Sequence, residues 1–132
     1  MSEENMEIVR AAVEAANRGD WDAAFKDAAP SFEWDNSRAM NVDSPGILTV
    51  GEARQFFKQA LGLWESAWIE INELIPTGDQ VVVPHTIHFR GRDGIETQAR
   101  STWVFTIRNG KMERVCLYQD TDEALEAVGL SQ

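Results

Sequence analysis

Length, composition and charge place this chain among single-domain globular proteins and exclude several functions. Its 132 residues suit one domain, expected to span 1–132, and 43% hydrophobic residues are enough for a real core. The formal net charge of −10, with scattered Lys and Arg, argues against a nucleic-acid partner, because phosphate backbones need clustered cations. Apolar runs are too short to cross a membrane, and the acidic N-terminus lacks a signal-peptide pattern, so a cytoplasmic location is expected.

The first part of the chain predicts two helices and a short strand. Between Ser2 and Gly19, apolar side chains recur at helical spacing, and glycine suits a left-handed stop. A second, shorter helix is expected between Asp20, its predicted cap, and Pro30. "SFEWDN", residues 31–36, alternates aromatic with polar side chains as a strand does. The next stretch, "SRAMNVDSPGIL", is expected to be irregular.

A third helix gives the clearest periodic signal in the sequence. "TVGE", which begins at Thr49, has the form of a capping box, in which each side chain satisfies a free backbone N–H of the first turn. The apolar positions that follow recur at helical spacing: Ala53, Phe56, Phe57, Ala60, Leu61 and Trp64. The helix is therefore expected to press a strongly apolar face against a large neighbouring surface.

The rest of the chain alternates strands with turns and closes with a helix. The predicted strands are "WIEINELI", "VVVPHTIHFR", "ETQARSTWVFTIR" and "MERVCLYQ", and Asn109-Gly110 is a strong hairpin signal. "DEALEAVG" is the closing helix. Helices followed by a run of strands indicate an α+β protein, in which a curved antiparallel sheet wraps around helices packed on one of its faces.

A curved sheet around helices encloses a pocket, and strand parity proposes its lining. His85 and Trp103 occupy inward-facing positions on two successive strands, and Phe57 and Leu61 cover them from the third helix. Aromatic-lined hollows with few polar groups are the usual form of a small-molecule site, so the predicted partner is a small hydrophobic molecule. In the alternative interpretation, the same side chains fill the core and leave no cavity.

Four segments carry a resemblance to a known family: "ENMEIVRAAVEAANRGDWDAAF", "SFEWD", "RNGKMERVCLYQD" and "DEALEAVGL". Together they resemble the SnoaL-like proteins of the nuclear transport factor 2-like superfamily, whose relatives include ketosteroid isomerase, limonene epoxide hydrolase and polyketide cyclases. The resemblance implies a cystatin-like cone, or α+β barrel, over nearly the whole chain. It implies no single reaction, because this fold hosts isomerases, hydrolases, cyclases and non-catalytic binders.

The resemblance also implies two catalytic candidates. Ketosteroid isomerases end the strand after their second helix in a proton-shuttling Asp, and "FEWD" puts Asp35 at that position. The acid/base Asp that polyketide cyclases carry after the hairpin glycine corresponds to Asp120. The departures concern the oxyanion donors: Ala12 replaces the first-helix Tyr, and Trp103 stands at or next to the second, acidic donor. The steroid-isomerase reaction itself is therefore not implied.

The residues allow a structural and a chemical interpretation of each carboxylate. A carboxylate held dry beside Trp34 would have a raised pKa and be a better base, whereas Asp35 in a turn with Asn36 and Ser37 would face water. Asp120 can equally cap the closing helix. Arg114 lies on the same face of the last strand as Asp120 and is expected to neutralise Asp120 by forming an ion pair with it.

The remaining candidates are expected to shape or orient a ligand: Trp34, Phe57, Leu61, His85, Trp103 and Tyr118. His85 and His88 stand three apart on one strand and point to opposite faces, so neither a metal site nor a cofactor is predicted. Cys116 is expected to be a buried packing residue.

The sequence therefore predicts a protein that binds a small hydrophobic molecule in a cone-shaped pocket. Acid/base catalysis of the isomerase, cyclase or hydrolase type is the accompanying hypothesis, with Asp35 as base and Asp120 as second carboxylate. The alternative is a non-catalytic ligand-binding or dimeric assembly module of the same fold. By resemblance, a homodimer is expected, formed through the outer sheet face that carries Thr102, Val104 and Thr106.

Overall fold

The computed structural model describes residues 2–38 and 46–130 of the chain. Its elements follow in the order α1 (Ser2–Asn17), α2 (Trp21–Ala24), β1 (Ala28–Asp35), β2 (Ile47–Thr49), α3 (Val50–Gly62), β3 (Ser66–Ile71), β4 (Ile75–Thr77), β5 (Gln80–Arg90), β6 (Glu96–Arg108), β7 (Lys111–Tyr118) and α4 (Thr121–Ala127). Most of the stretch that the sequence predicted as irregular, 39–45, lies outside the described residues.

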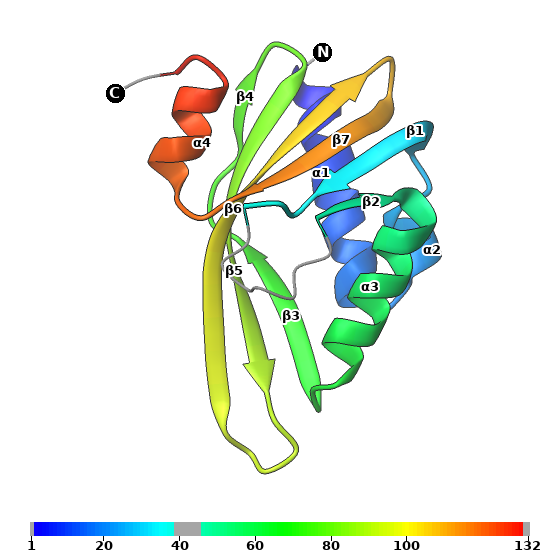
Figure 1. Ribbon diagram of the computed structural model, residues 1–132, viewed down its shortest axis with the longest axis vertical. Coiled ribbons are helices and arrows are strands. Elements are labelled where there is room, and N and C mark those ends of the chain that lie inside the picture. Colours follow the sequence, from blue (N-terminus) through cyan, green and yellow to red (C-terminus); the bar gives the residue numbers. More distant parts are fainter. Residues whose placement is uncertain (1, 39–45, 131–132) are drawn as a thin grey trace.

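One curved, unclosed sheet organises the molecule, and the predicted α+β class is confirmed (Figure 1). Its strand order is β2-β1-β7-β6-β5-β3, with β4 paired to β5. The long β5–β6 and β6–β7 pairs are antiparallel, as expected. The sheet is nevertheless mixed, because β1 lies parallel to β7, so the first and the last strand of the chain are neighbours.

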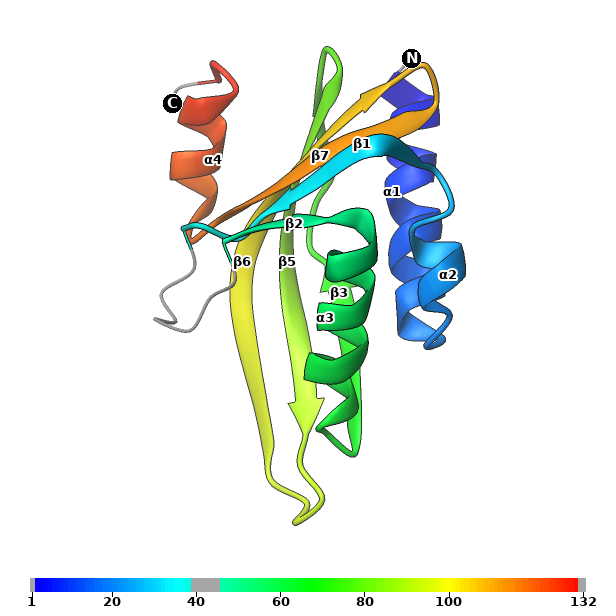
Figure 2. The ribbon, with the colours of Figure 1, turned by 45° about the vertical axis from the view of Figure 1, so that its right-hand side comes forward.

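Helices cover both faces of this sheet rather than one. Figures 1 and 2 show α1, α2 and α3 on its concave side and α4 on the opposite, outer side. The expectation that all helices share one face is therefore wrong for α4. The cause is a second apolar cluster on the outer face, where Ala124 and Leu125 of α4 are buried with Val82, Val104 and Cys116.

Local signals in the sequence set most element boundaries. Asp20 accepts a hydrogen bond from the backbone N–H of Ala23, and both arms of the Thr49–Glu52 capping box form. The turn between β6 and β7 has left-handed backbone at Asn109 (φ 53°) and at the following glycine, as the Asn-Gly signal predicts. These boundaries are confirmed.

Other boundaries differ from the predictions. Pro30 lies inside β1 instead of ending α2, at a place where the β1–β7 register shifts between Ala28 and Glu33. Such an irregularity tolerates proline, which has no N–H to give to a ladder. The stretch "WIEINELI" is divided between β3 and β4, and Trp64 lies just beyond the end of α3. The three-residue strand β2 was not predicted.

The edge strand β3 is held by a side chain of α1. The Asn17 amide donates to the carbonyl oxygen of Ile69 at 2.9 Å and accepts from its backbone N–H at 2.7 Å. An asparagine amide carries one donor group and one acceptor, so it can satisfy both backbone groups of one strand residue. This pair fixes α1 against the sheet beside the aromatic core.

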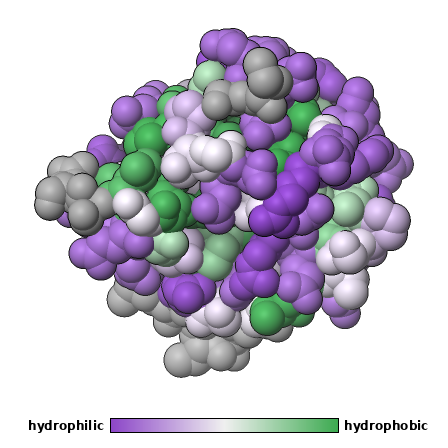
Figure 3. All heavy atoms as spheres, turned by 90° about the horizontal axis from the view of Figure 1, so that it is seen from above, coloured by the Kyte–Doolittle hydropathy of each residue, from purple (hydrophilic) through white to green (hydrophobic). Residues whose placement is uncertain are grey.

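Polar side chains cover most of the end of the molecule seen in Figure 3, as the high net charge leads one to expect. Within residues 2–38 and 46–130, no helix combines the length and the apolar character that a membrane-spanning segment needs.

Candidate functional site on the concave face

An apolar cavity lies between the sheet and the first three helices. Its volume is about 40 Å³, and its lining is entirely apolar. Three of the predicted substrate-binding residues, Trp34, Phe57 and Trp103, are part of that lining, together with Ala16 of α1. The space holds far less than a small-molecule ligand, and a purely apolar hollow of this kind stays dry.

Aromatic rings pack tightly around this cavity. The Trp34 ring lies edge-on to Phe57, with 4.6 Å between the ring centroids, and edge-on to Trp103 at 5.4 Å. The Trp34 indole N–H donates to the Asn36 side-chain oxygen at 2.8 Å. The polar atom of the indole is therefore satisfied, and the aromatic wall presents only apolar surface to the cavity.

His85 stands at the end of this wall. Only 1% of it is exposed, and its ring stacks on Trp103 with a centroid separation of 3.7 Å. Its Nδ1 lies 3.0 Å from the Val83 carbonyl oxygen, and its Nε2 lies 2.8 Å from the Ser101 hydroxyl oxygen. Burial lowers the pKa of His85 to about 4, against a smaller opposing effect of the Val83 hydrogen bond, so the ring is neutral at pH 7.

Strand parity placed Ser101 on the predicted lining face, but sequence reasoning assigned it no role in the site. It lies directly opposite His85 in the β5–β6 register and is half-buried. The sequence shows that Ser101 and Trp103 point to the same face of their strand. Only the register between β5 and β6 shows that Ser101 lies opposite His85. A polar pair next to an aromatic wall is the arrangement that orients ligands in apolar sites.

Asp35 lies on the other side of the sheet. Because side chains alternate along β1, the buried Trp34 faces the cavity while Asp35 faces the outer side, where it is only 4% exposed. Its carboxylate accepts hydrogen bonds from Arg114 at 2.5 Å and from the backbone and the hydroxyl of Ser37. Arg114 was expected to pair with Asp120; it pairs with Asp35 and Glu33 instead.

These partners determine the protonation state of Asp35. Burial acts to raise its pKa, but the hydrogen bonds from Ser37 and the charges of Arg114 and Arg38 outweigh burial and hold the pKa below its ordinary value of 3.8. A carboxylate stabilised as an anion is a weaker base. The raised pKa that the acid/base hypothesis needs is therefore not what this environment produces.

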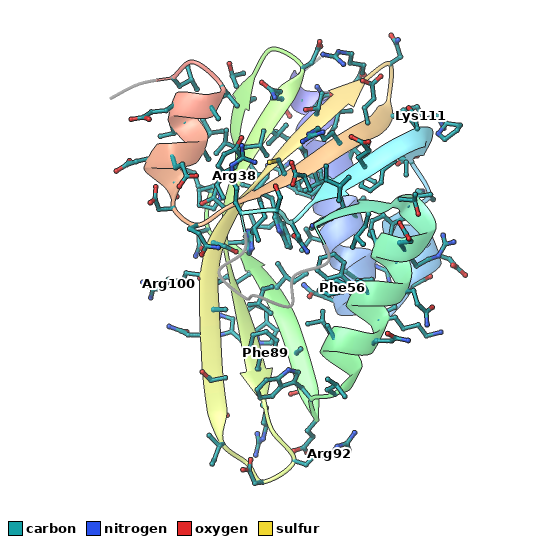
Figure 4. The ribbon with its side chains drawn as sticks, in the orientation of Figure 1. Arg38, Phe56, Phe89, Arg92, Arg100 and Lys111 are labelled. Atoms are coloured by element: carbon teal, nitrogen blue, oxygen red, sulfur yellow. The ribbon has the colours of Figure 1, made fainter. Side chains whose placement is uncertain are left out.

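The other predicted residues are dispersed. Asp120 is exposed and caps α4, accepting the backbone N–H of Glu123 at 2.8 Å. Tyr118 belongs to the outer cluster under α4, with the Arg38 guanidinium 4.8 Å from the centre of its ring. Leu61 is half-buried on α3. In Figure 4, Arg38 lies on the α4 side and Arg100 projects from β6 away from the first three helices.

His88 confirms the predicted opposition of the two histidines. It stacks on Trp68 with ring centroids 4.4 Å apart and lies 2.8 Å from a Glu70 carboxylate oxygen, on the outer face. The structure thus brings together Trp34, Phe57, His85 and Trp103 on the concave face. Asp35 lies on the opposite face, whereas Asp120 lies outside this group but lines a second, wider hollow together with His85 and Ser101. The roles assigned to Asp35 and Asp120 stay predictions.

Comparison with known proteins places this geometry in a family. A family model described as a SnoaL-like domain matches residues 9–115, so the chain belongs to the SnoaL-like proteins of the nuclear transport factor 2-like superfamily. Comparison with curated proteins finds no match.

Solved structures of similar fold accompany the family match. An NTF2-like protein of unknown function from Burkholderia pseudomallei is 20% identical, with a TM-score of 0.73 over 96% of this chain and 98% of that one. TerC, co-crystallized with polyporic acid, is 21% identical, with a TM-score of 0.71 over 95% and 97%. Delta 5-3-ketosteroid isomerase from Mycobacterium sp. is 10% identical, with a TM-score of 0.72 over 89% and 93%. At these identities the likeness shows the fold alone.

Proposed function

We propose that the protein binds a small hydrophobic molecule with a planar ring system on the concave face of its sheet. The observation that carries this proposal is the apolar cavity walled by Trp34, Phe57 and Trp103, with the His85–Ser101 pair beside it. Apolar walls with a few placed polar groups are typical of small-molecule sites. TerC, which shares the fold, was co-crystallized with the small molecule polyporic acid, and this supports the proposal.

Phe57 is the side chain that must move to admit a ligand. The cavity of about 40 Å³ is much smaller than the roughly 300 Å³ at the lower end of ligand pockets. Phe57 is half-buried, stacks on Trp21 and lies against Trp34. If its ring swings outward, a ligand ring can take its place against Trp34 and keep the aromatic contacts.

Tryptophan fluorescence can test this proposal, because Trp34 and Trp103 wall the site. We expect planar hydrophobic probes to quench the emission of the native protein and to bind more tightly to Phe57→Ala, whose cavity is enlarged. Ala16→Met extends a flexible side chain into the cavity and is expected to weaken binding at least tenfold. Ala11→Met makes the same change on the exposed side of α1 and serves as the control, and Trp68→Ala removes an indole of the outer face that is 48% exposed.

The outcome that overturns the proposal is equally specific. If binding survives Ala16→Met and is lost in Trp68→Ala, the probes bind the outer face and the concave site has no ligand. An absence of binding to both the native protein and Phe57→Ala also overturns it.

The sequence also led to the hypothesis that Asp35 and Asp120 carry out acid/base catalysis on the bound molecule. The ion pair of Asp35 with Arg114 and the capping role of Asp120 support binding without turnover by these carboxylates. A panel of hydrophobic ketones, epoxides and lactones tests the point. Turnover that is lost in a folded Asp35→Asn variant would restore Asp35 to the mechanism, whereas unchanged turnover would remove it.

We also propose that the part of the outer face around β3, beyond α4, forms the contact of a homodimer. Two of the residues expected at this contact, Thr102 and Val104, are instead buried under α4 of the same chain. Trp68 is 48% exposed there, although its ring is already held by His88, and an exposed aromatic residue on a sheet face is typical of an interface. Sedimentation at micromolar concentration tests the proposal. Native protein is expected at twice the chain mass and Trp68→Glu at the 14.8 kDa of one chain. A native monomer would overturn the proposal.

A further inference from the structure

The hydrogen bonds at His85 run in one direction only. The Val83 carbonyl oxygen can accept but not donate, so Nδ1 of His85 carries the ring proton that donates to it at 3.0 Å. In the neutral ring, Nε2 then has a lone pair and no proton. The Ser101 hydroxyl, 2.8 Å away, must therefore donate its only proton to Nε2. Ser101 therefore donates to His85, and His85 donates to the Val83 carbonyl oxygen.

This direction determines what Ser101 can offer to a ligand. Its proton is committed to His85, so its oxygen has lone pairs to accept a hydrogen bond and nothing to donate. Among the described residues, Ser101 makes no hydrogen bond through its side chain other than the one to His85. Because burial keeps His85 neutral at pH 7, this polarity holds at physiological pH.

Ser101 lies where β6 changes from exposed to buried. The five residues before it, 96–100, are exposed, whereas 102–105 are buried. Ala99, the next residue on the same face towards the hairpin tip, is exposed, and Ile87 opposite it is half-buried. Ser101 is thus a polar residue at the border between the buried aromatic wall and the exposed part of the sheet, and it lines the second, wider hollow together with His85.

We propose that Ser101 accepts a hydrogen bond from a ligand hydroxyl group, so that the preferred ligands are phenols or enols whose ring lies against the aromatic wall. This inference rests on the proposed function and adds the ligand's chemical class to it. His85 is a positioning residue: it does not touch the ligand but fixes the direction of the Ser101 hydroxyl. A methyl ether of the same shape offers only another acceptor, and two acceptors that face each other leave a desolvated group without a partner.

A matched pair of probes tests this inference: 2-naphthol, which has a hydroxyl proton, and 2-methoxynaphthalene, which lacks one. Affinities are measured by calorimetry at pH 7 for the native protein and for Ser101→Ala, His85→Phe and Ser66→Ala. Ser66→Ala is the matched control, because it makes the same chemical change at an exposed residue of β3. We expect the native protein and the control to prefer naphthol by about tenfold or more.

The variants separate a directional contact from simple packing. Ser101→Ala is expected to bind the two probes equally. In His85→Phe the Ser101 proton is released, so the hydroxyl can donate to the ether oxygen and the preference for naphthol is expected to fall or reverse. If His85→Phe does not fold, Ser101→Ala decides alone. A residual preference for naphthol in Ser101→Ala would overturn the inference.

The two proposals fail in different ways. If the native protein binds both probes equally, the inference about Ser101 is overturned and the concave site remains. If neither probe binds the native protein or Phe57→Ala, the proposed function fails and the inference fails with it.

Discussion

Asp35 and Arg114 form an ion pair that joins the first strand of the chain to the last. The two side chains lie 2.5 Å apart, although 79 positions separate them in the sequence. Arg114 also pairs with Glu33 at 3.0 Å, two residues earlier on β1. Glu33 lies opposite Arg114 in the parallel register of β1 and β7, so the charge pairing and the strand register support each other.

We predict that Arg114→Leu destabilises the fold and raises the pKa of Asp35. The variant leaves a buried carboxylate without its closest cation, which is expected to lower the free energy of unfolding by about 1–3 kcal/mol. Arg108→Leu is the control, because Arg108 pairs with Asp79 and Glu113 at an exposed site, where an ion pair contributes less than about 1 kcal/mol. Urea denaturation at pH 7 measures both. Equal losses in the two variants would contradict the prediction.

The same ion pair makes the protein sensitive to acid. Because the folded-state pKa of Asp35 lies below 3.8, the folded protein binds fewer protons at this group than the unfolded chain does. Its contribution to stability is present above pH 3.8 and is lost as the pH falls through the folded-state value. In Asp35→Asn we expect a weaker dependence of stability on pH in this acidic range, measured by denaturation at a series of pH values.

His85 predicts a second, separate dependence on pH. Its pKa falls from 6.5 to about 4 on folding, so between these values the unfolded chain binds the extra proton. Stability should therefore be fully present above about pH 6.5 and decline as the pH falls towards 4, by roughly 3 kcal/mol in total at 1.36 kcal/mol per pH unit.

Two histidine variants isolate this effect. His85→Phe keeps an aromatic ring in place but cannot take up a proton, so the decline between pH 6.5 and 4 should largely disappear. His88→Gln changes the histidine on the outer face and should retain the decline. An unchanged pH profile in a folded His85→Phe variant would show that His85 does not titrate in this range.

Asp120 can be assigned a structural or a chemical role by two substitutions. As the N-cap of α4, it should tolerate Asp120→Asn, because asparagine caps about as well as aspartate, while Asp120→Ala should cost about 1 kcal/mol. If Asp120 is an acid/base residue, Asp120→Asn should abolish turnover, because an amide cannot take up and release a proton as a carboxylate does. Thermal denaturation measures the first effect and turnover of any identified substrate measures the second. A stable Asp120→Asn variant without activity would favour catalysis.

Filling the apolar cavity is predicted to stabilise the free protein. Ala16→Met places a flexible, unbranched side chain at the cavity wall, and a well-fitted filler contributes about 0.5–2 kcal/mol. Ala11→Met, on the exposed side of the same helix, is the matched control and should change stability by less than about 0.5 kcal/mol. A loss of stability confined to Ala16→Met would mean that the cavity cannot accept the added atoms.

Local chemistry explains which features the sequence predicted. The Thr49–Glu52 capping box and the turn at Asn109 depend on neighbouring residues only, and both formed as expected. The fold class followed from the order of helices and strands together with the family resemblance. The inward positions of His85 and Trp103 followed from the alternation of side chains along long strands.

Long-range pairing explains what could not be predicted. The partner of Arg114 depends on the parallel alignment of β1 with β7, which no local pattern specifies. Ser101 gained its importance only from its register with His85. The face of the sheet on which Asp35 lies could have been predicted, because side chains alternate along β1 and Asp35 directly follows Trp34. The prediction of an apolar environment beside Trp34 did not take this alternation into account. The alternation of side chains along a strand determines the face on which a residue lies, whereas its cross-strand partners depend on how the strands pair in the fold.

The contact between Asn17 and Ile69 also has a meaning for self-association. β3 ends the sheet, and the unpaired backbone of an edge strand is a template on which another chain can add a strand. The amide of Asn17 occupies both backbone groups of Ile69, inside this six-residue strand, so an incoming strand would find its ladder interrupted there. The Asn17 side chain therefore hinders the addition of a strand from another chain at this edge of the sheet.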